Sequence, residues 1–162
     1  MRSLSIVIPV ACVAALIGGR AGGDLQQSSA NGTHAVTRQI IRIPNAPTSP
    51  LYSQAVKVGP NIYVTGILGL DPATNKAAGP TIQEQTRQAL INCQNILRAA
   101  GASFENVVEV QVLLARPGDF AGLNEEYAKF FSRDPPVRSV TRLGPELPDI
   151  LVSIRMNAIV LD

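Results

Sequence analysis

Apolar and polar residues alternate along six short stretches of the chain, and this two-residue period predicts β-strands. The stretches lie at 37–43, 54–58, 61–65, 106–115, 137–143 and 150–161. A Gly-Pro-Asn sequence at 59–61 joins the second and third stretches and is typical of a tight hairpin. Residues 66–80, which contain Asp-Pro and Gly-Pro pairs, are predicted to form a loop.

Two other stretches show the three- and four-residue spacing of a helix that buries one face. Thr81 and Glu84 match a capping box and predict the start of the first helix, and Gly101 is expected to follow its end. Asp119 precedes the second helix. The expected buried faces comprise Ala89, Cys93, Ile96, Leu97 and Ala100 in the first helix and Phe120, Leu123, Tyr127, Phe130 and Phe131 in the second.

The order of three strands, a helix, a strand, a helix and two strands predicts an α+β fold with both helices on one face of the sheet. The second face of such a sheet is uncovered, so we expect an oligomer that buries it. The alternation also assigns faces within strands. In the strand at 106–115, one face should carry Val108, Val110, Val112 and Leu114. In the strand at 150–161, one face should carry Ile150, Val152, Ile154, Met156, Ala158 and Val160, and the other should carry Ser153, Arg155, Asn157 and Ile159.

The first 23 residues have the features of a secretory signal peptide. Arg2 precedes an almost wholly apolar stretch, small residues follow it, and no acidic residue occurs before Asp24. Residues 24–36 are polar and predict a flexible linker, in which Asn31 begins a glycosylation sequon. We therefore expect a single domain at 37–162 in a secreted or periplasmic protein without a stable membrane anchor, or a cytoplasmic one if the start is misassigned.

Composition narrows the function classes. Of the 14 basic residues, Arg2 and Arg20 lie in the signal segment, so twelve remain against 12 acidic ones. A neutral domain lacks the basic excess of nucleic-acid-binding proteins, which argues against a nucleic-acid partner. The only histidine is His34, and the only cysteines are Cys12 and Cys93. These counts predict no metal site and no intramolecular disulfide, and they favour a packing role for Cys93.

One arginine stands out in the strand that follows Pro135 and Pro136. Arg138 shares a strand face with Val140 and Arg142, opposite the face of Val137, Ser139, Thr141 and Leu143. A guanidinium offers a planar fork of donors whose natural ligand is a carboxylate. The alternative is an edge-strand arginine that pairs with an acid or extends into solvent.

Five segments, taken in order, resemble the reactive intermediate deaminase family, also called the RidA/YjgF/L-PSP family. The likeness covers about residues 38–161 and is carried by 50–56 (PLYSQAV), 62–66 (IYVTG), 123–127 (LNEEY) with Phe130 and Phe131, 136–139 (PVRS) and 157–159 (NAI). It implies a chorismate-mutase-like (YjgF-like) fold with a six-stranded mixed sheet, assembled as a homotrimer with its pockets between subunits. The implied activity is hydrolysis of enamines and imines, such as 2-iminobutanoate and 2-iminopropanoate, to 2-keto acids and ammonia without cofactor or metal.

The resemblance also implies roles for individual residues. Arg138 matches the arginine that holds the substrate carboxylate, and Thr65 stands where many relatives have serine. Tyr52 and Asn124 match pocket residues, although a packing aromatic and an asparagine that ties down a loop are the alternatives. The expected substrate-binding set for a small 2-imino or 2-keto acid is Tyr52, Thr65, Gly66, Asn124, Arg138 and Val140.

Three departures from the family pattern bear on catalysis. Asn157 occupies the expected place of a glutamate that positions or activates water, and an amide cannot accept a proton as a carboxylate does. Arg155 adds positive charge near it, and Ile67 replaces a polar residue. We therefore expect Arg138 and Asn157 as catalytic residues of a deaminase with reduced activity. The alternatives are a non-catalytic trimeric protein, either small-carboxylate-binding or chaperone-like, and an endoribonuclease, which the neutral charge and missing histidine disfavour.

Overall fold

The computed structural model describes residues 37–44 and 49–161. The expected signal peptide at 1–23 and linker at 24–36, with Cys12, Asn31 and His34, lie outside these residues. Within the described part of the chain, no helix is both long enough and apolar enough to cross a membrane.

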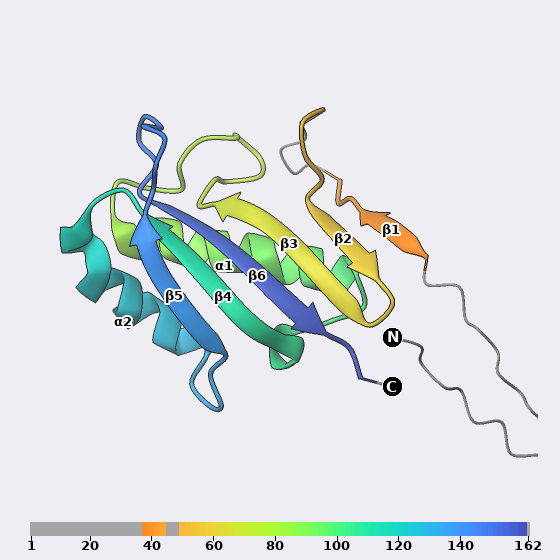
Figure 1. The fold of residues 1–162 in the computed structure, drawn as a ribbon. Helices are drawn as coiled ribbons and strands as arrows, with labels where there is room; N and C mark the ends of the chain where they lie inside the picture. The colour runs from red at the N-terminus through yellow and green to blue at the C-terminus, as the bar shows by residue number, and fades with distance from the viewer. Residues whose placement is uncertain (1–36, 45–48, 162) are drawn as a thin grey trace, which may run out of the picture. The chain divides into compact units, whose positions relative to one another are not determined.

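Six strands form one mixed sheet in the order β1-β2-β3-β6-β4-β5 (Figure 1). Neighbouring strands are antiparallel except β4 and β5, which run parallel. The strands are β1 (Arg38–Ile41), β2 (Ala55–Val58), β3 (Asn61–Leu68), β4 (Val107–Leu114), β5 (Val137–Arg142) and β6 (Val152–Ile159). All six predicted strands are present, and the α+β class with a six-stranded mixed sheet is confirmed.

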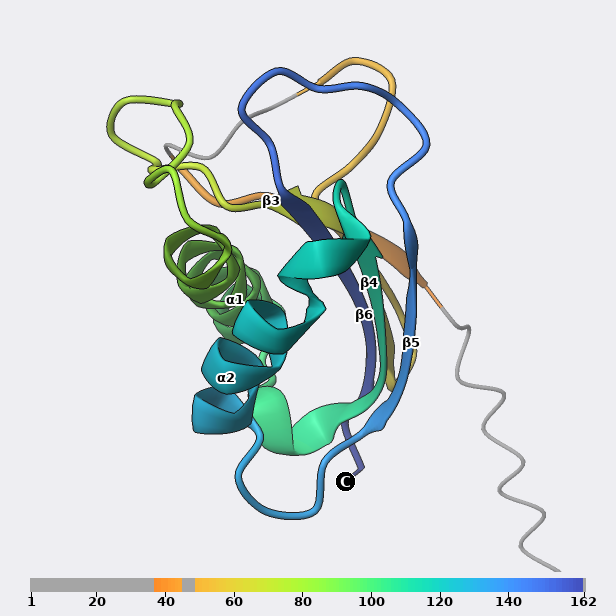
Figure 2. The ribbon, with the colours of Figure 1, turned by 90° about the vertical axis from the view of Figure 1, so that its left-hand side faces the viewer.

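Both helices cover the same face of the sheet, as Figure 2 shows edge-on, and this prediction is also confirmed. The longer helix α1 (Ile82–Ala99) packs on β3 and β6, and α2 (Phe120–Phe130) packs against α1. Two 3₁₀ turns, η1 (Phe104–Asn106) and η2 (Pro117–Asp119), precede β4 and α2. The opposite face of the sheet carries no helix within the described residues.

The ends of α1 follow from local chemistry. The Thr81 hydroxyl accepts a hydrogen bond from the Glu84 amide, and the Glu84 carboxylate accepts one from the Thr81 amide at 3.0 Å. This reciprocal pair satisfies amides that have no partner inside the helix. At the other end Gly101 has φ +79°, a conformation that costs glycine little.

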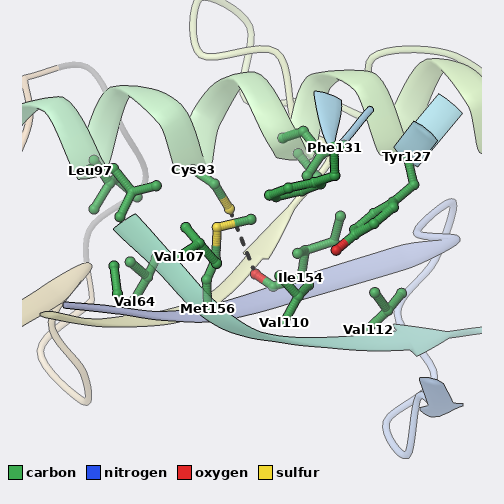
Figure 3. Close-up of a cluster of buried hydrophobic side chains, with 14 of the residues drawn as sticks. Val64, Cys93, Leu97, Val107, Val110, Val112, Tyr127, Phe131, Ile154 and Met156 are labelled. Atoms are coloured by element: carbon green, nitrogen blue, oxygen red, sulfur yellow. Dashed lines mark hydrogen bonds between the residues drawn. The ribbon is translucent and has the colours of Figure 1, made fainter. Parts of the chain in front are cut away.

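The core fills the space between the sheet and the helices (Figure 3). Cys93 of α1 is fully buried there, and its thiol lies 3.8 Å from the Ile154 carbonyl oxygen to which it donates. Burial raises the pKa of the Cys93 thiol, so the thiol stays protonated and unreactive at neutral pH. The predicted packing role of Cys93 is confirmed.

Three details differ from the sequence prediction. Phe120, predicted on the buried face of the second helix, is 45% exposed, so that prediction is wrong. Irregular strand pairing explains the other two. The strand β3 continues to Leu68 because Ile67 and Leu68 still pair with β6 beyond a bulge, so residues 66–68 are not loop as predicted. In β4 a register shift between Val107 and Glu109 puts Val107 in the core. Val108 is therefore 44% exposed, and its predicted place on the buried face is wrong.

A buried carboxylate joins the two helices. Glu126 of α2 is 1% exposed, and its two oxygens accept hydrogen bonds from Arg87 at 2.6 and 3.0 Å and from Lys129 at 2.7 Å. The hydrogen bonds from Arg87 hold the pKa of Glu126 below its usual value. The Arg87–Glu126 ion pair therefore links α1 to α2.

We expect Glu126→Gln to lower the free energy of unfolding by about 1–3 kcal/mol, since a buried amide NH₂ would then face the donors of Arg87 or Lys129. A carboxyl whose pKa is lowered on folding contributes stability above its unfolded value of about 4.3, and this contribution is lost as the pH falls through the folded pKa. Urea unfolding between pH 3 and 7 should therefore show a smaller loss on acidification in the variant. Glu125→Gln alters the exposed neighbour on α2 and keeps an oxygen that can accept from the Gln83 side-chain amide, which lies 3.3 Å away. It is the control and should match the unaltered protein.

Candidate functional site

Three of the predicted site residues line one cavity of about 310 Å³, beside α1 and the end of β3. We call Tyr52, Thr65 and Gly66 the first cluster. Apolar side chains form much of the remaining wall, and Asn92 of α1 fixes part of it by donating to the Leu70 carbonyl oxygen at 2.8 Å. The apolar lining comprises Ile43, Pro44, Ile67, Leu68, Leu70, Pro72 and Ile96.

The bulge in β3 shapes the first cluster. Thr65 and Gly66 lie within the register shift between Val64 and Ile67, and the Thr65 amide donates instead to the Gln54 carbonyl oxygen at 3.0 Å. A Cβ atom on Gly66 would lie only 2.7 Å from the Ser153 hydroxyl oxygen of β6. A larger residue at this position would force the Ser153 side chain to shift, whereas the Gly66 backbone stays exposed beside Thr65.

Arg138 lies at the opposite edge of the sheet, on β5, with its guanidinium over two aromatic rings. The guanidinium carbon is 4.7 Å from the centre of the Tyr127 ring and 5.9 Å from that of Phe120. Among the residues that the structure describes, no acid forms an ion pair with Arg138. Its donors are free for an external anion, which favours the ligand hypothesis over the ion-pair alternative.

Asn124 and Val140 lie near Arg138, and we call these three residues the second cluster. Phe120, Asn124 and Tyr127 follow one another at four- and three-residue spacing, so they share the face of α2 over which the Arg138 guanidinium lies. The side-chain oxygen of Asn124 is buried, and no hydrogen-bond donor reaches it in the described structure. Val140 is half-buried against the core on the same face of β5.

The two clusters do not meet within one chain. The first lies around β2 and β3, the second lies at β5, and β6 and β4 run between them (Figure 1). Three strand spacings separate β3 from β5, which amounts to about 14 Å. A small ligand bound to one chain alone could not contact both clusters.

Asn157 lies on the face of β6 that no helix covers, between Tyr63 of β3 and Glu109 of β4. Its amide nitrogen donates to a Glu109 carboxylate oxygen at 2.5 Å, while its own oxygen is buried without a partner in the described structure. Glu109 was not among the predicted site residues. Strand alternation places Glu109 and Gln111 on the same face of β4. It could not show that β6, and therefore Asn157, lies beside them.

Arg155 is the β6 residue that lies across from the first cluster. Val64 pairs with Met156 and Ile67 pairs with Ile154, so the Thr65–Gly66 bulge faces Arg155. On its other side Arg155 pairs with Gln111, and its side chain is exposed. Arg155 thus lies opposite the bulge on the neighbouring strand, but its side chain does not line the cavity of the first cluster. It lines a separate small pocket with Glu109, Gln111 and Asn157.

Within residues 37–44 and 49–161, no group of three or more histidine, cysteine, aspartate or glutamate side chains is arranged to hold a metal ion.

Comparisons with known proteins agree with this fold. Residues 43–160 match the family model described as Endoribonuclease L-PSP. A 2-iminobutanoate/2-iminopropanoate deaminase from Capra hircus is 42% identical over 111 residues, which are 68% of this chain and 81% of that protein. A RutC family protein from Pyrococcus horikoshii is 38% identical over 123 residues, which are 75% of this chain and 97% of that protein.

Solved structures of similar proteins superpose over most of the described chain. The crystal structure of RidA from an Antarctic Psychrobacter has a TM-score of 0.70 and 34% identity, and the match covers 75% of this chain and 99% of that one. The structure of TdcF from Escherichia coli with bound serine has a TM-score of 0.70 and 29% identity. The match covers 76% of this chain and 99% of that one. The model match and these relatives show that the chain belongs to the RidA/YjgF family, also described as the Endoribonuclease L-PSP family.

Proposed function

We propose that the protein hydrolyses small 2-imino acids, and the enamines that tautomerise to them, to 2-keto acids and ammonia. The observation that carries the proposal is Arg138, an arginine over two aromatic rings with no acidic partner in the described structure. Relatives named as deaminases at about 40% identity support the same chemistry.

The proposed site forms between subunits. The first and second clusters are too far apart in one chain, and the helix-free face of the sheet would be buried in an oligomer. We propose a homotrimer in which the second cluster of one subunit lies against the first cluster of its neighbour. Light scattering should give the mass of three chains, and the mass of a single chain would contradict both the trimer and the shared site.

In this site Arg138 binds the substrate carboxylate through two parallel hydrogen bonds. We propose that the Thr65 hydroxyl and the exposed backbone at Gly66 bind the imine end, with Tyr52 and Asn124 around it. Water then adds to the imine carbon, and the resulting carbinolamine loses ammonia to leave the keto acid. Holding the imine carbon in one orientation supplies a large part of the acceleration.

Activation of the water is the weaker part of this site. Asn157 cannot take up a proton as a carboxylate does, and its amide nitrogen already donates to Glu109. Arg155, opposite the Thr65–Gly66 bulge, adds positive charge on β6 rather than a base. We therefore propose slow turnover combined with firm binding of the carboxylate.

The direct test couples the purified protein to an amino acid oxidase or to threonine dehydratase, which release 2-imino acids. We expect the protein to speed the release of keto acid and ammonia beyond the rate in buffer alone. A rate equal to that in buffer with every imino acid tried would contradict the proposal.

A non-catalytic role in binding small carboxylates is the second candidate. Two observations favour it. The Glu109 carboxylate is held by a hydrogen bond from Asn157, and the residue opposite the Thr65–Gly66 bulge is the cation Arg155. Neither residue therefore offers a free base to a substrate in the first cluster. Calorimetry with pyruvate and 2-oxobutanoate separates the two functions. Binding that depends on Arg138, without any turnover in the coupled assays, would support this candidate.

A further inference from the structure

The geometry points to Tyr127 and Phe120 as positioning residues that hold the Arg138 guanidinium and leave its hydrogen-bond donors free for the substrate carboxylate. The inference rests on the proposed function. It assigns these two aromatic residues of α2 a role in carboxylate binding, in addition to any role in packing.

An arginine on an edge strand has a long and flexible side chain, which must be fixed before it can hold a ligand in one orientation. An acidic partner would fix it, but it would also occupy the donors that a carboxylate needs. Aromatic faces attract the cation through the ring quadrupole and occupy none of its N–H groups. The 4.7 Å and 5.9 Å distances to Tyr127 and Phe120 fit this second arrangement.

The Tyr127 ring is itself rigidly supported. It is 6% exposed and stacks on Phe131 with ring centres 4.6 Å apart (Figure 3). Burial raises the pKa of the Tyr127 hydroxyl to about 12, and the positive charge of Arg138 offsets only part of this effect. The phenol therefore stays neutral at physiological pH and does not become an anionic partner of Arg138.

Phe120 is the more exposed of the two rings beside the Arg138 guanidinium. Its side chain is 45% exposed at the start of α2, where a phenylalanine gains little from burial. The apolar stripe predicted for α2 therefore has two parts. Leu123, Tyr127 and Phe131 are buried in the core, whereas Phe120 lies at the edge beside Arg138.

The test measures the affinity for 2-oxobutanoate by calorimetry and the steady-state constants in the coupled assay. We expect Phe120→Leu to weaken binding about threefold and Tyr127→Leu about fivefold to tenfold, with KM rising and kcat changing less than twofold. Tyr127→Phe keeps the ring and should bind within twofold of the unaltered protein. Phe130→Leu is the matched control, because Phe130 contacts Phe104 and not Arg138.

A double-mutant cycle distinguishes positioning from general packing. Phe120→Leu should have no effect on affinity once Arg138→Gln is present, because the ring then has no cation to hold. Equal losses with Arg138 and with Arg138→Gln would overturn the inference, as would unchanged affinity in Phe120→Leu. A different result would contradict the proposed function itself: unchanged 2-oxobutanoate binding in the single variant Arg138→Gln.

Discussion

Replacing Arg138 by alanine should lower kcat/KM for imine hydrolysis on the order of 10²-fold or more, the largest loss that we expect from any single substitution. The guanidinium is the only cation of the second cluster, and it has no acidic partner in the described structure to share its donors. Without it the imine carbon is no longer held in one orientation toward water, and positioning of this kind is worth several powers of ten. The coupled oxidase assay and calorimetry with 2-oxobutanoate measure the effect.

The chain provides a matched control on the same strand. Arg142 shares the strand face of Arg138 and is exposed, so Arg142→Ala removes the same charge from β5 four residues away. We expect its activity to remain within twofold. Arg138→Lys should bind the keto acid more weakly than the unaltered protein, since an ammonium cannot form the bidentate pair. Equal losses from the changes at Arg138 and Arg142 would mean that only net charge matters.

Introducing a carboxylate on β6 should raise the rate, and the size of the gain should depend on its position. Arg155→Glu places an acid opposite the Thr65–Gly66 bulge, and we expect an increase of about 10²-fold, toward the lower end of general-base assistance. Asn157→Glu should gain about tenfold. It lies opposite Tyr63, and Glu109, which contacts the Asn157 amide at 2.5 Å, would repel a second carboxylate there.

Three further variants show whether these gains come from the new base or from the change in charge. Arg155→Gln removes the cation without adding a base and so isolates the effect of charge. Arg98→Glu reverses an exposed charge on α1 that belongs to neither cluster. The combined change Arg155→Glu with Asn157→Glu should exceed either single change. A gain from Asn157→Glu that surpasses that from Arg155→Glu would show that the water lies beside Asn157, as the sequence resemblance implied. No gain from any of them would favour the binding-protein function.

The strands and helices followed from the sequence because each depends on local periodicity and on short-range chemistry. The capping box at Thr81 and the glycine at 101 involve residues that are close along the chain, so their partners could be identified without the fold. The likeness to the family identified Arg138, Tyr52, Thr65 and Gly66 individually. It did not show which of them one chain brings together.

Tertiary structure alone decided how these residues combine. The bulge at Thr65–Gly66 and the register shift at Val107 arise from pairing with β6, whose partners lie about 50 to 90 residues away along the chain. The same pairing places Arg155 opposite the Thr65–Gly66 bulge and Glu109 against Asn157, and the packing of α2 under β5 places two rings beneath Arg138. A two-residue period assigns each side chain to a face of its strand, but it cannot assign the neighbouring strand, because that choice depends on how the whole sheet packs against its helices.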